Sequence, residues 1–118
     1  MRVRAATVPS RYKGLFGSRT RDCVLKFLGL VEQSYPREMS ALLGEHLNVV
    51  QRTLNDLELD RILASRLFGR VRLFELNRTY QHYGQLRELL RSMGLADPKI
   101  FEIVSRLRRR PRRAGKPL

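Results

Sequence analysis

The chain lacks most of the residue clusters from which enzymes build their active sites. Its 118 residues include no tryptophan and a single cysteine, so no disulfide can form within the chain. Cys23 lies in an apolar run, where a lone thiol packs as a small hydrophobic side chain. We find no glycine-rich phosphate-binding loop and no nucleophile beside a base. We therefore expect a protein that is not an enzyme and needs no cofactor.

Metal ligands and membrane-spanning segments are missing as well. Besides Cys23, the candidate metal ligands are His46 and His82, which fall in different predicted elements, so we expect no metal site. No apolar run approaches the length that spans a bilayer, and the N-terminus has no secretory hydrophobic region. These absences predict a cytoplasmic protein that does not bind membranes.

Acidic residues are absent from both ends of the chain. All 11 lie between Asp22 and Glu102, although the formal net charge is +13. The charge is therefore concentrated in two basic arms, residues 1–14 and 109–118. Such arms suit a polyanion, because each neutralised phosphate releases counterions. An anionic membrane surface and a merely solvated tail are the alternatives, but the arms lack the large apolar residues that insert into lipid. The candidate phosphate contacts of the tail are Arg108, Arg109, Arg110, Arg112, Arg113 and Lys116.

The spacing of apolar residues predicts two helices before a glycine turn. Steps of three and four residues predict the first helix over residues 19–31, with Ser18 as its cap. Pro36 suits the first position of a second helix, which continues over residues 37–43. Gly44 then ends this helix, because glycine tolerates a positive φ.

A third helix is predicted over residues 47–60, where Val50, Leu54 and Leu57 form an apolar stripe. Its opposite side carries amides, which can pair with adenine, and an arginine, which can pair with guanine. A solvated helix face is the alternative, but a basic hairpin follows this helix and favours DNA reading. The candidate DNA-binding residues here are Arg37, His46, Asn48, Gln51, Arg52 and Asn55.

Two β-prone runs on either side of Gly69 predict a hairpin over residues 62–76. Arg66, Arg70 and Arg72 cluster near its turn and complete the candidate DNA-binding set. Phe68 beside the turn is a candidate contact residue, but we expect it to fold back onto its apolar neighbours Leu67 and Val71.

Two more helices are predicted in residues 78–108, the first over residues 83–93 with Gly94 as its end. Asp97 and Pro98 then begin a helix that extends to about Arg108. The two helices carry more apolar side chains than the back of a small domain needs, so we predict a homodimer through them. The alternative is that they cover the core of their own chain. These side chains are Leu86, Leu89, Leu90, Met93, Ile100, Phe101, Val104 and Leu107.

The order of elements in residues 15–77 predicts a mainly α fold with a small β-hairpin wing, the winged helix-turn-helix. The chain also resembles winged helix-turn-helix transcriptional regulators of the arsenic-repressor-like class, in the variety often found near small nucleotidyltransferases. The resemblance rests on the segments Leu15–Arg21, Tyr35–Met39, Val50–Glu58 and Gly69–Asn77. It implies that residues 47–60 form the recognition helix and residues 62–76 the wing. His46 stands where that class usually has a capping Ser or Thr, Glu45 where an apolar residue is usual, and Leu67, Phe68 and Val71 where the wing is usually charged.

Together these features predict a sequence-specific regulator, a repressor of its own or neighbouring genes, that binds double-stranded DNA as a dimer. A winged-helix module that binds another protein is the first alternative. A basic RNA-binding protein is the second, although the aromatic residues that stacking on bases requires are few.

Overall fold

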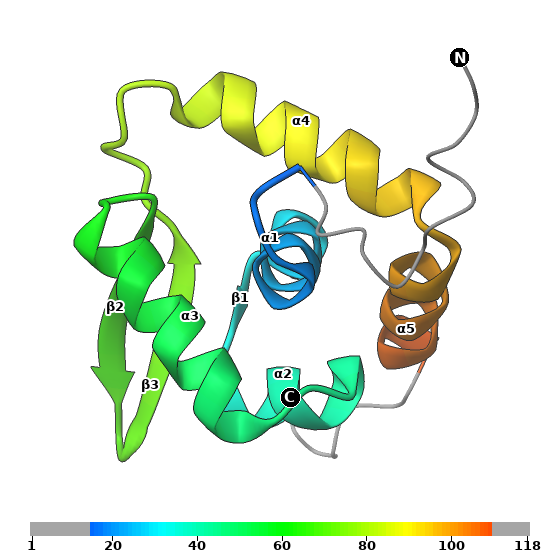
Figure 1. Cartoon of the computed structure of the whole chain (residues 1–118), viewed down its shortest axis with the longest axis horizontal. Helices are drawn as coiled ribbons and strands as arrows, with labels where there is room; N and C mark the ends of the chain where they lie inside the picture. The colour runs from blue at the N-terminus through cyan, green and yellow to red at the C-terminus, as the bar shows by residue number, and fades with distance from the viewer. Residues whose placement is uncertain (1–14, 110–118) are drawn as a thin grey trace.

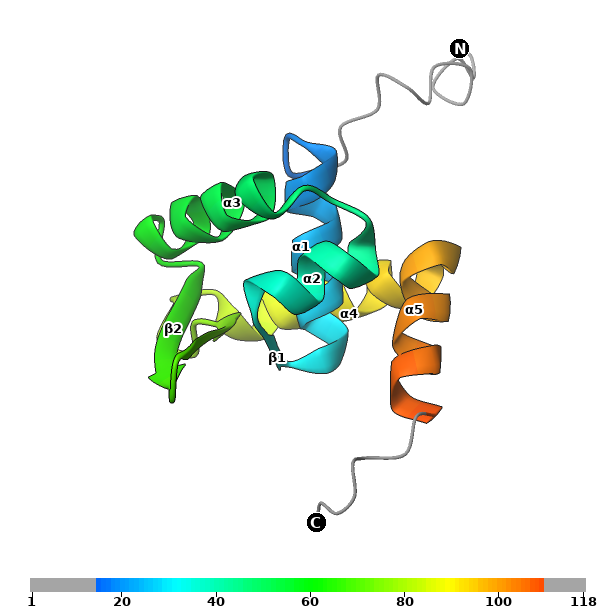
Figure 2. The same cartoon turned by 90° about the horizontal axis from the view of Figure 1, so that it is seen from below.

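One central helix, α1 (Arg19–Val31), organises the computed structural model, which describes residues 15–109. The elements that follow are β1 (Gln33–Ser34), α2 (Pro36–Leu43), α3 (Leu47–Leu59), β2 (Leu63–Phe68), β3 (Val71–Leu76), α4 (Tyr83–Ala96) and α5 (Pro98–Arg109). Figures 1 and 2 show α2, α3, α4 and α5 arranged around α1. The sequence-predicted class, mainly α with a β-hairpin wing, is confirmed.

The central helix begins and ends where the sequence predicts. Ser18 precedes it in an extended conformation, and its side chain accepts a hydrogen bond from the backbone N–H of Arg21 at 3.0 Å. This bond satisfies one of the donors that the first helical turn leaves free. From Asp22 to Leu30 every residue is buried, which places α1 inside the hydrophobic core rather than on its edge.

The helix-turn-helix consists of α2 and α3. Pro36 occupies the start of α2, and Gly44 ends it in the left-handed conformation with φ 69°. Ser40 stabilises the turn, because its hydroxyl donates a hydrogen bond to the carbonyl of Glu45 at 2.6 Å. The apolar side chains that face the core from these two helices are Met39, Leu43, Val50, Leu54 and Leu57.

The sheet has three strands in the order β1-β3-β2, all antiparallel. Strands β2 and β3 form the predicted wing, with unbroken pairing from Leu63–Leu76 to Phe68–Val71. Strand β1, in which Ser34 pairs with Phe74, was not predicted. A strand of two residues has no periodicity that a sequence pattern could reveal, and only the fold brings it beside β3.

Helix α4 differs from the prediction at its C-terminus. Gly94 does not end it, and the helix continues to Ala96. Gly94 is buried instead against α1, where a methyl group in place of its hydrogen would lie 3.0 Å from Leu30 Cδ1. Gly29 of α1 makes a similar approach, since its added Cβ would lie 2.8 Å from Leu90 Cβ. The two glycines therefore allow α1 and α4 to pack unusually closely.

A buried ionic cluster joins α1 to the turn between α4 and α5. The ammonium of Lys26 lies 2.7 Å from Asp22 and 2.8 Å from Asp97. Burial alone would lower the pKa of Lys26, but the hydrogen bonds and negative charges of the two carboxylates raise it. Burial likewise opposes ionisation of Asp97, yet the hydrogen bond from Lys26 and those from the backbone of Ile100 and Lys99 hold its pKa below the ordinary value. Asp97 also caps α5, as predicted.

The apolar side chains of α4 and α5 mostly face their own chain. Leu90, Ile100 and Val104 are buried in the shared core, and Leu86, Met93 and Leu107 are partly buried. Leu89 and Phe101 are exposed, and so is Leu95, which the sequence analysis did not single out. The surface available for pairing is therefore smaller than the eight predicted residues suggest.

Candidate nucleic-acid interface

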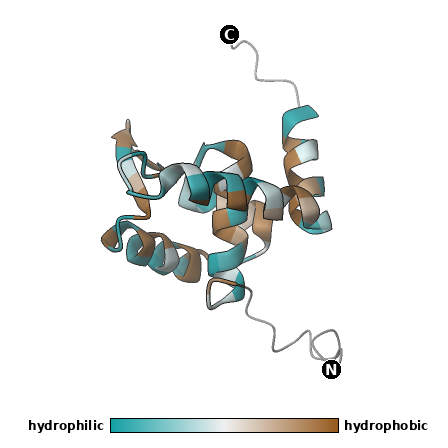
Figure 3. Cartoon of the chain, turned by 90° about the horizontal axis from the view of Figure 1, so that it is seen from above, coloured by the Kyte–Doolittle hydropathy of each residue, from teal (hydrophilic) through white to brown (hydrophobic). Residues whose placement is uncertain are grey.

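The outward face of α3 carries the predicted base-reading side chains. Asn48, Gln51, Arg52 and Asn55 are all exposed, and none makes a side-chain hydrogen bond or ion pair with another residue in the range 15–109. The buried stripe of Val50, Leu54 and Leu57 fixes the rotation of the helix, so these polar groups point away from the core. In Figure 3 the ribbon of α3 alternates between brown and teal segments, as an amphipathic helix should.

Arg37 lies at the start of α2, and His46 lies immediately before α3. Arg37 lies in the first turn of α2 and is exposed. His46 is the residue that precedes α3, and its side chain makes no capping hydrogen bond there. Both side chains are exposed and therefore accessible to a phosphate.

The wing arginines differ in how firmly they are held. Arg72 donates a hydrogen bond to Ser65 Oγ at 2.9 Å, and Ser65 in turn donates to Glu58 of α3 at 2.6 Å. Arg66 donates to Gln33 of β1 at 3.0 Å. Arg70, in the turn, has no hydrogen bond or ion pair with any residue that the structure describes. These hydrogen bonds from Arg72 to Glu58 join the wing to α3, and they could not be predicted from the sequence because they depend on the strand register.

The tip of the wing is apolar and open to solvent. Leu67 is 62% exposed, Phe68 68% and Val71 38%. The expectation that Phe68 folds back for cover is wrong, because at the last pair of a two-residue turn its neighbours are themselves exposed. Gly69 takes a φ of 67°, as the predicted turn requires.

Glu45, which departs from the usual pattern of the resembled class, has a structural role. Its carboxylate accepts a hydrogen bond from Thr20 at 2.9 Å and lies 3.6 Å from Arg19. These contacts join the helix-turn-helix turn to the start of α1. A nearby pair, Arg21 with Asp60 at 3.3 Å, joins α1 to the end of α3. Helix α3 is thus anchored to α1 at both ends.

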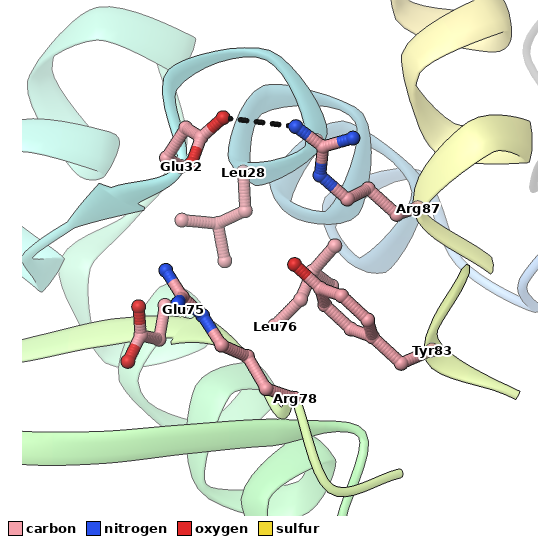
Figure 4. Close-up of a pocket in the computed structure, with 8 residues that line it drawn as sticks. Leu28, Glu32, Glu75, Leu76, Arg78, Tyr83 and Arg87 are labelled. Atoms are coloured by element: carbon pink, nitrogen blue, oxygen red, sulfur yellow. Dashed lines mark hydrogen bonds and ion pairs between the residues drawn. The ribbon is translucent and has the colours of Figure 1, made fainter. Parts of the chain in front are cut away.

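The described residues bring together no set of side chains that could hold a metal ion. No group of three or more His, Cys, Asp or Glu residues comes together in the part of the chain that the structure covers. Cys23 is buried, and this burial raises the pKa of its thiol. The hollow in Figure 4 has a volume of about 10 Å³, enough for a single water molecule. It lies between α1, β3 and the start of α4, where Arg87 and Glu32 form an ion pair at 3.2 Å.

The two basic arms fall largely outside the described residues. This applies to residues 1–14 and, in the tail, to Arg110, Arg112, Arg113 and Lys116. Arg108 and Arg109 belong to α5, so the tail begins after them. Arg108 is already engaged, because it donates a hydrogen bond to the carbonyl of Leu30 near the end of α1 at 2.6 Å. Within residues 15–109, no helix has both the length and the apolar character needed to cross a membrane.

Comparison with known proteins supports the fold. No protein-family model matches the sequence, and no curated protein sequence matches it. Among solved structures, the chain is similar to the crystal structure of the adhesin competence repressor AdcR of Streptococcus pyogenes, with a TM-score of 0.57. The match covers 87% of this chain and 85% of that chain at 16% sequence identity. At this identity the likeness concerns the fold: the chain has the winged-helix architecture of that repressor.

Proposed function

We propose that this protein is a sequence-specific DNA-binding transcriptional regulator, acting as a repressor, that places α3 in the major groove. The observation that carries the proposal is the outward face of α3, where Asn48, Gln51, Arg52 and Asn55 are exposed without partners in the described chain. Amide and guanidinium groups at helical spacing match the hydrogen-bonding edges of base pairs. The wing would then lie beside α3 along the duplex.

Two further observations support this function. The structurally similar AdcR is a repressor by name, and its fold covers most of this chain. The chain also carries a formal net charge of +13, and its ends hold many of the basic residues. Membership of the arsenic-repressor-like class, suggested by residue patterns, stays a prediction, as does a location in the cytoplasm.

Selection of bound duplexes from a random pool by the full chain tests the proposal. We expect enrichment of a defined motif, and loss of that enrichment when Gln51 and Arg52 are both changed to alanine. A matched control is Gln85→Ala with Arg91→Ala on α4, a helix away from α3 (Figure 1). Equal, salt-sensitive binding to every duplex and to RNA would contradict base reading by α3 and favour a polyanion-binding role. No binding to any nucleic acid would favour the protein-interaction alternative.

The basic tail is proposed to add affinity without sequence preference. A truncation after Arg109 preserves the contact between Arg108 and Leu30 and removes Arg110, Arg112, Arg113 and Lys116. If all four meet phosphates, the slope of log affinity against log salt should fall by roughly 4 units, at about 0.9 per phosphate. The preferred motif should stay the same. An unchanged slope would show that the tail does not contact DNA.

We further propose that the protein binds DNA as a homodimer. One recognition helix contacts only a few base pairs, whereas two copies about one helical turn apart can specify a longer site. The exposed apolar residues of the C-terminal helices, Leu89, Leu95 and Phe101, are the candidate contacts. Sedimentation at micromolar concentration should give a dimer, and Phe101→Glu should weaken it. A monomer in solution that also binds singly to DNA would contradict the proposed homodimer.

A further inference from the structure

The apolar tip of the wing needs an explanation that the base-reading face of α3 does not supply. Three large apolar side chains, Leu67, Phe68 and Val71, are exposed together at the end of a thin hairpin. A cluster of exposed apolar residues is typical of a surface that binds another molecule. Three arginines, Arg66, Arg70 and Arg72, lie within two residues of this cluster in the sequence.

The strand register shows how the tip is built. Residues that pair across antiparallel strands share one face, so Phe68 and Val71 lie side by side on one face of the hairpin. The pair Leu67–Arg72 lies on the other face. Beyond the last pair only Gly69 and Arg70 complete the turn. The end of the wing is therefore a narrow apolar edge with Arg70 at its point.

The two strands of the wing are paired along their whole length. The ladder between β2 and β3 is continuous up to Phe68–Val71, and near the base of the wing β3 also pairs with β1, at Phe74 and Glu75. The hydrogen bonds from Arg72 to Ser65 and from Ser65 to Glu58 fasten one face to α3, and that from Arg66 to Gln33 fastens the other to β1. These hydrogen bonds oppose bending of the hairpin. Its apolar end can therefore press against a partner without the hairpin giving way.

We propose that the wing tip is a wedge, with Phe68 as its leading side chain, that enters the minor groove beside the α3 site and unstacks a base step. The proposal rests on the DNA-binding function above and adds a bend to it. Apolar side chains inserted from the minor groove kink duplexes, and arginine is attracted by the groove's negative potential. The minor groove is about 6 Å wide, whereas two paired strands with their side chains are wider than their backbone spacing of about 4.8 Å, so the wing would have to enter by its tip. This combination of an apolar edge with cations matches DNA better than it matches an apolar protein groove.

The test measures duplex shape rather than affinity alone, because the unstacking free energy offsets part of what the new contacts contribute. The probe is a mixed-sequence duplex, and the duplex from the pool selection where a motif is found. Dyes at its two ends report the bend, and 2-aminopurine beside the wing position reports unstacking. The wild-type chain should bend the duplex by roughly 20–90° and raise the 2-aminopurine fluorescence.

Substitutions at the tip then separate the wedge from simple binding. Phe68→Ala and Phe68→Arg should bind with a nearly straight duplex and no fluorescence rise, whereas Phe68→Leu should retain most of both signals. Leu15→Ala, at an exposed apolar residue ahead of α1, serves as the control and should behave as wild type. Tight wild-type binding to a straight, fully stacked duplex would overturn the wedge while leaving the proposed function intact. A bend that Phe68→Ala leaves unchanged would overturn it too, and failure of the wild type to bind any duplex would overturn both proposals.

Discussion

Helices α1 and α3 have the same length and opposite roles. Each contains 13 residues, but ten residues of α1 are buried and only three of α3. Helix α1 is covered by the other helices, whereas α3 presents one whole side to solvent (Figure 2). The difference shows that the two helices have separate roles in this small domain. Helix α1 forms the core, and α3 packs against it with one face while its other face stays exposed.

The largest effect on stability is expected when one charge is removed from each helix. Lys26→Met leaves Asp22 and Asp97 as uncompensated carboxylates in a mostly buried site, and Asp22 Oδ1 already has no hydrogen-bond partner among the described residues. We expect the free energy of unfolding to fall by roughly 3–5 kcal/mol. The matched control on α3 is Arg52→Met, which should change stability by less than about 0.5 kcal/mol because the side chain is exposed. Equal effects in urea denaturation would contradict the division of roles.

A smaller effect is expected where α1 meets α4. Gly29→Ala places a methyl group 2.8 Å from Leu90 Cβ, so the two helices must move apart. This overpacking should lower stability by about 1–3 kcal/mol, even though alanine favours a helix. Gly84→Ala, in the first turn of α4, has nothing within 4 Å and should stabilise instead. Thermal unfolding of the pair distinguishes close packing from a general loss of backbone freedom, and a stabilised Gly29→Ala variant would refute the close approach.

The positions of Lys26 and Gly94 show which features of the fold a sequence pattern cannot predict. Helix spacing and the Ser18 cap predict α1 to the residue, because capping and periodicity are local properties. The burial of Lys26 is not local, since its partner Asp97 lies 71 positions away. The prediction that Gly94 ends α4 is wrong because it used only the local sequence. The glycine is needed for close packing against Leu30 of α1, a contact that exists only in the folded chain.

The candidate interface also has one part that local periodicity predicts and another part that depends on the folded chain. The exposed face of α3 follows from the helical period, which separates Asn48 and Gln51 from the buried Val50 and Leu54. The support of the wing by Glu58 and Ser65 could not be predicted, because it depends on the exact pairing register and on the angle between α3 and β2. The exposure of Phe68 was not predicted either, since periodicity cannot show how far a hairpin projects from the core.

On α3 the comparison predicts large effects on binding with none on folding. Gln51→Ala and Arg52→Ala should each weaken binding to the selected duplex by roughly 1–3 kcal/mol, the range for a lost pair of base contacts. Binding to random duplex should change less, and the unfolding midpoint should stay within error because both side chains are exposed without partners in the described chain. Titration of each variant with the selected duplex and with random duplex measures whether the loss of affinity is specific to the selected sequence. A folded variant with wild-type affinity for the selected duplex would remove that residue from the site.

The smallest effect we predict is a dependence of stability on pH that comes from the ion pair of Lys26 with Asp97. The folded protein holds the pKa of Asp97 below its ordinary value of 3.8, so the carboxylate stabilises the fold above that pH. This contribution is lost as the pH falls through the lower, folded-state pKa. The pKa of Lys26 is raised above 10.5, so its contribution is complete below that pH and is lost only as the pH rises through the higher folded-state value.

Asp97→Asn keeps a side chain that can cap α5 but removes the charge. It should therefore be less stable than wild type at neutral pH, and the difference in urea midpoint should shrink as the pH is lowered below 3.8. Asp56→Asn on α3, where the carboxylate makes no ion pair with any described residue, should show no such convergence. Parallel curves for both variants across the acid range would mean that Asp97 acts only as a helix cap and that the buried ion pair does not stabilise the fold.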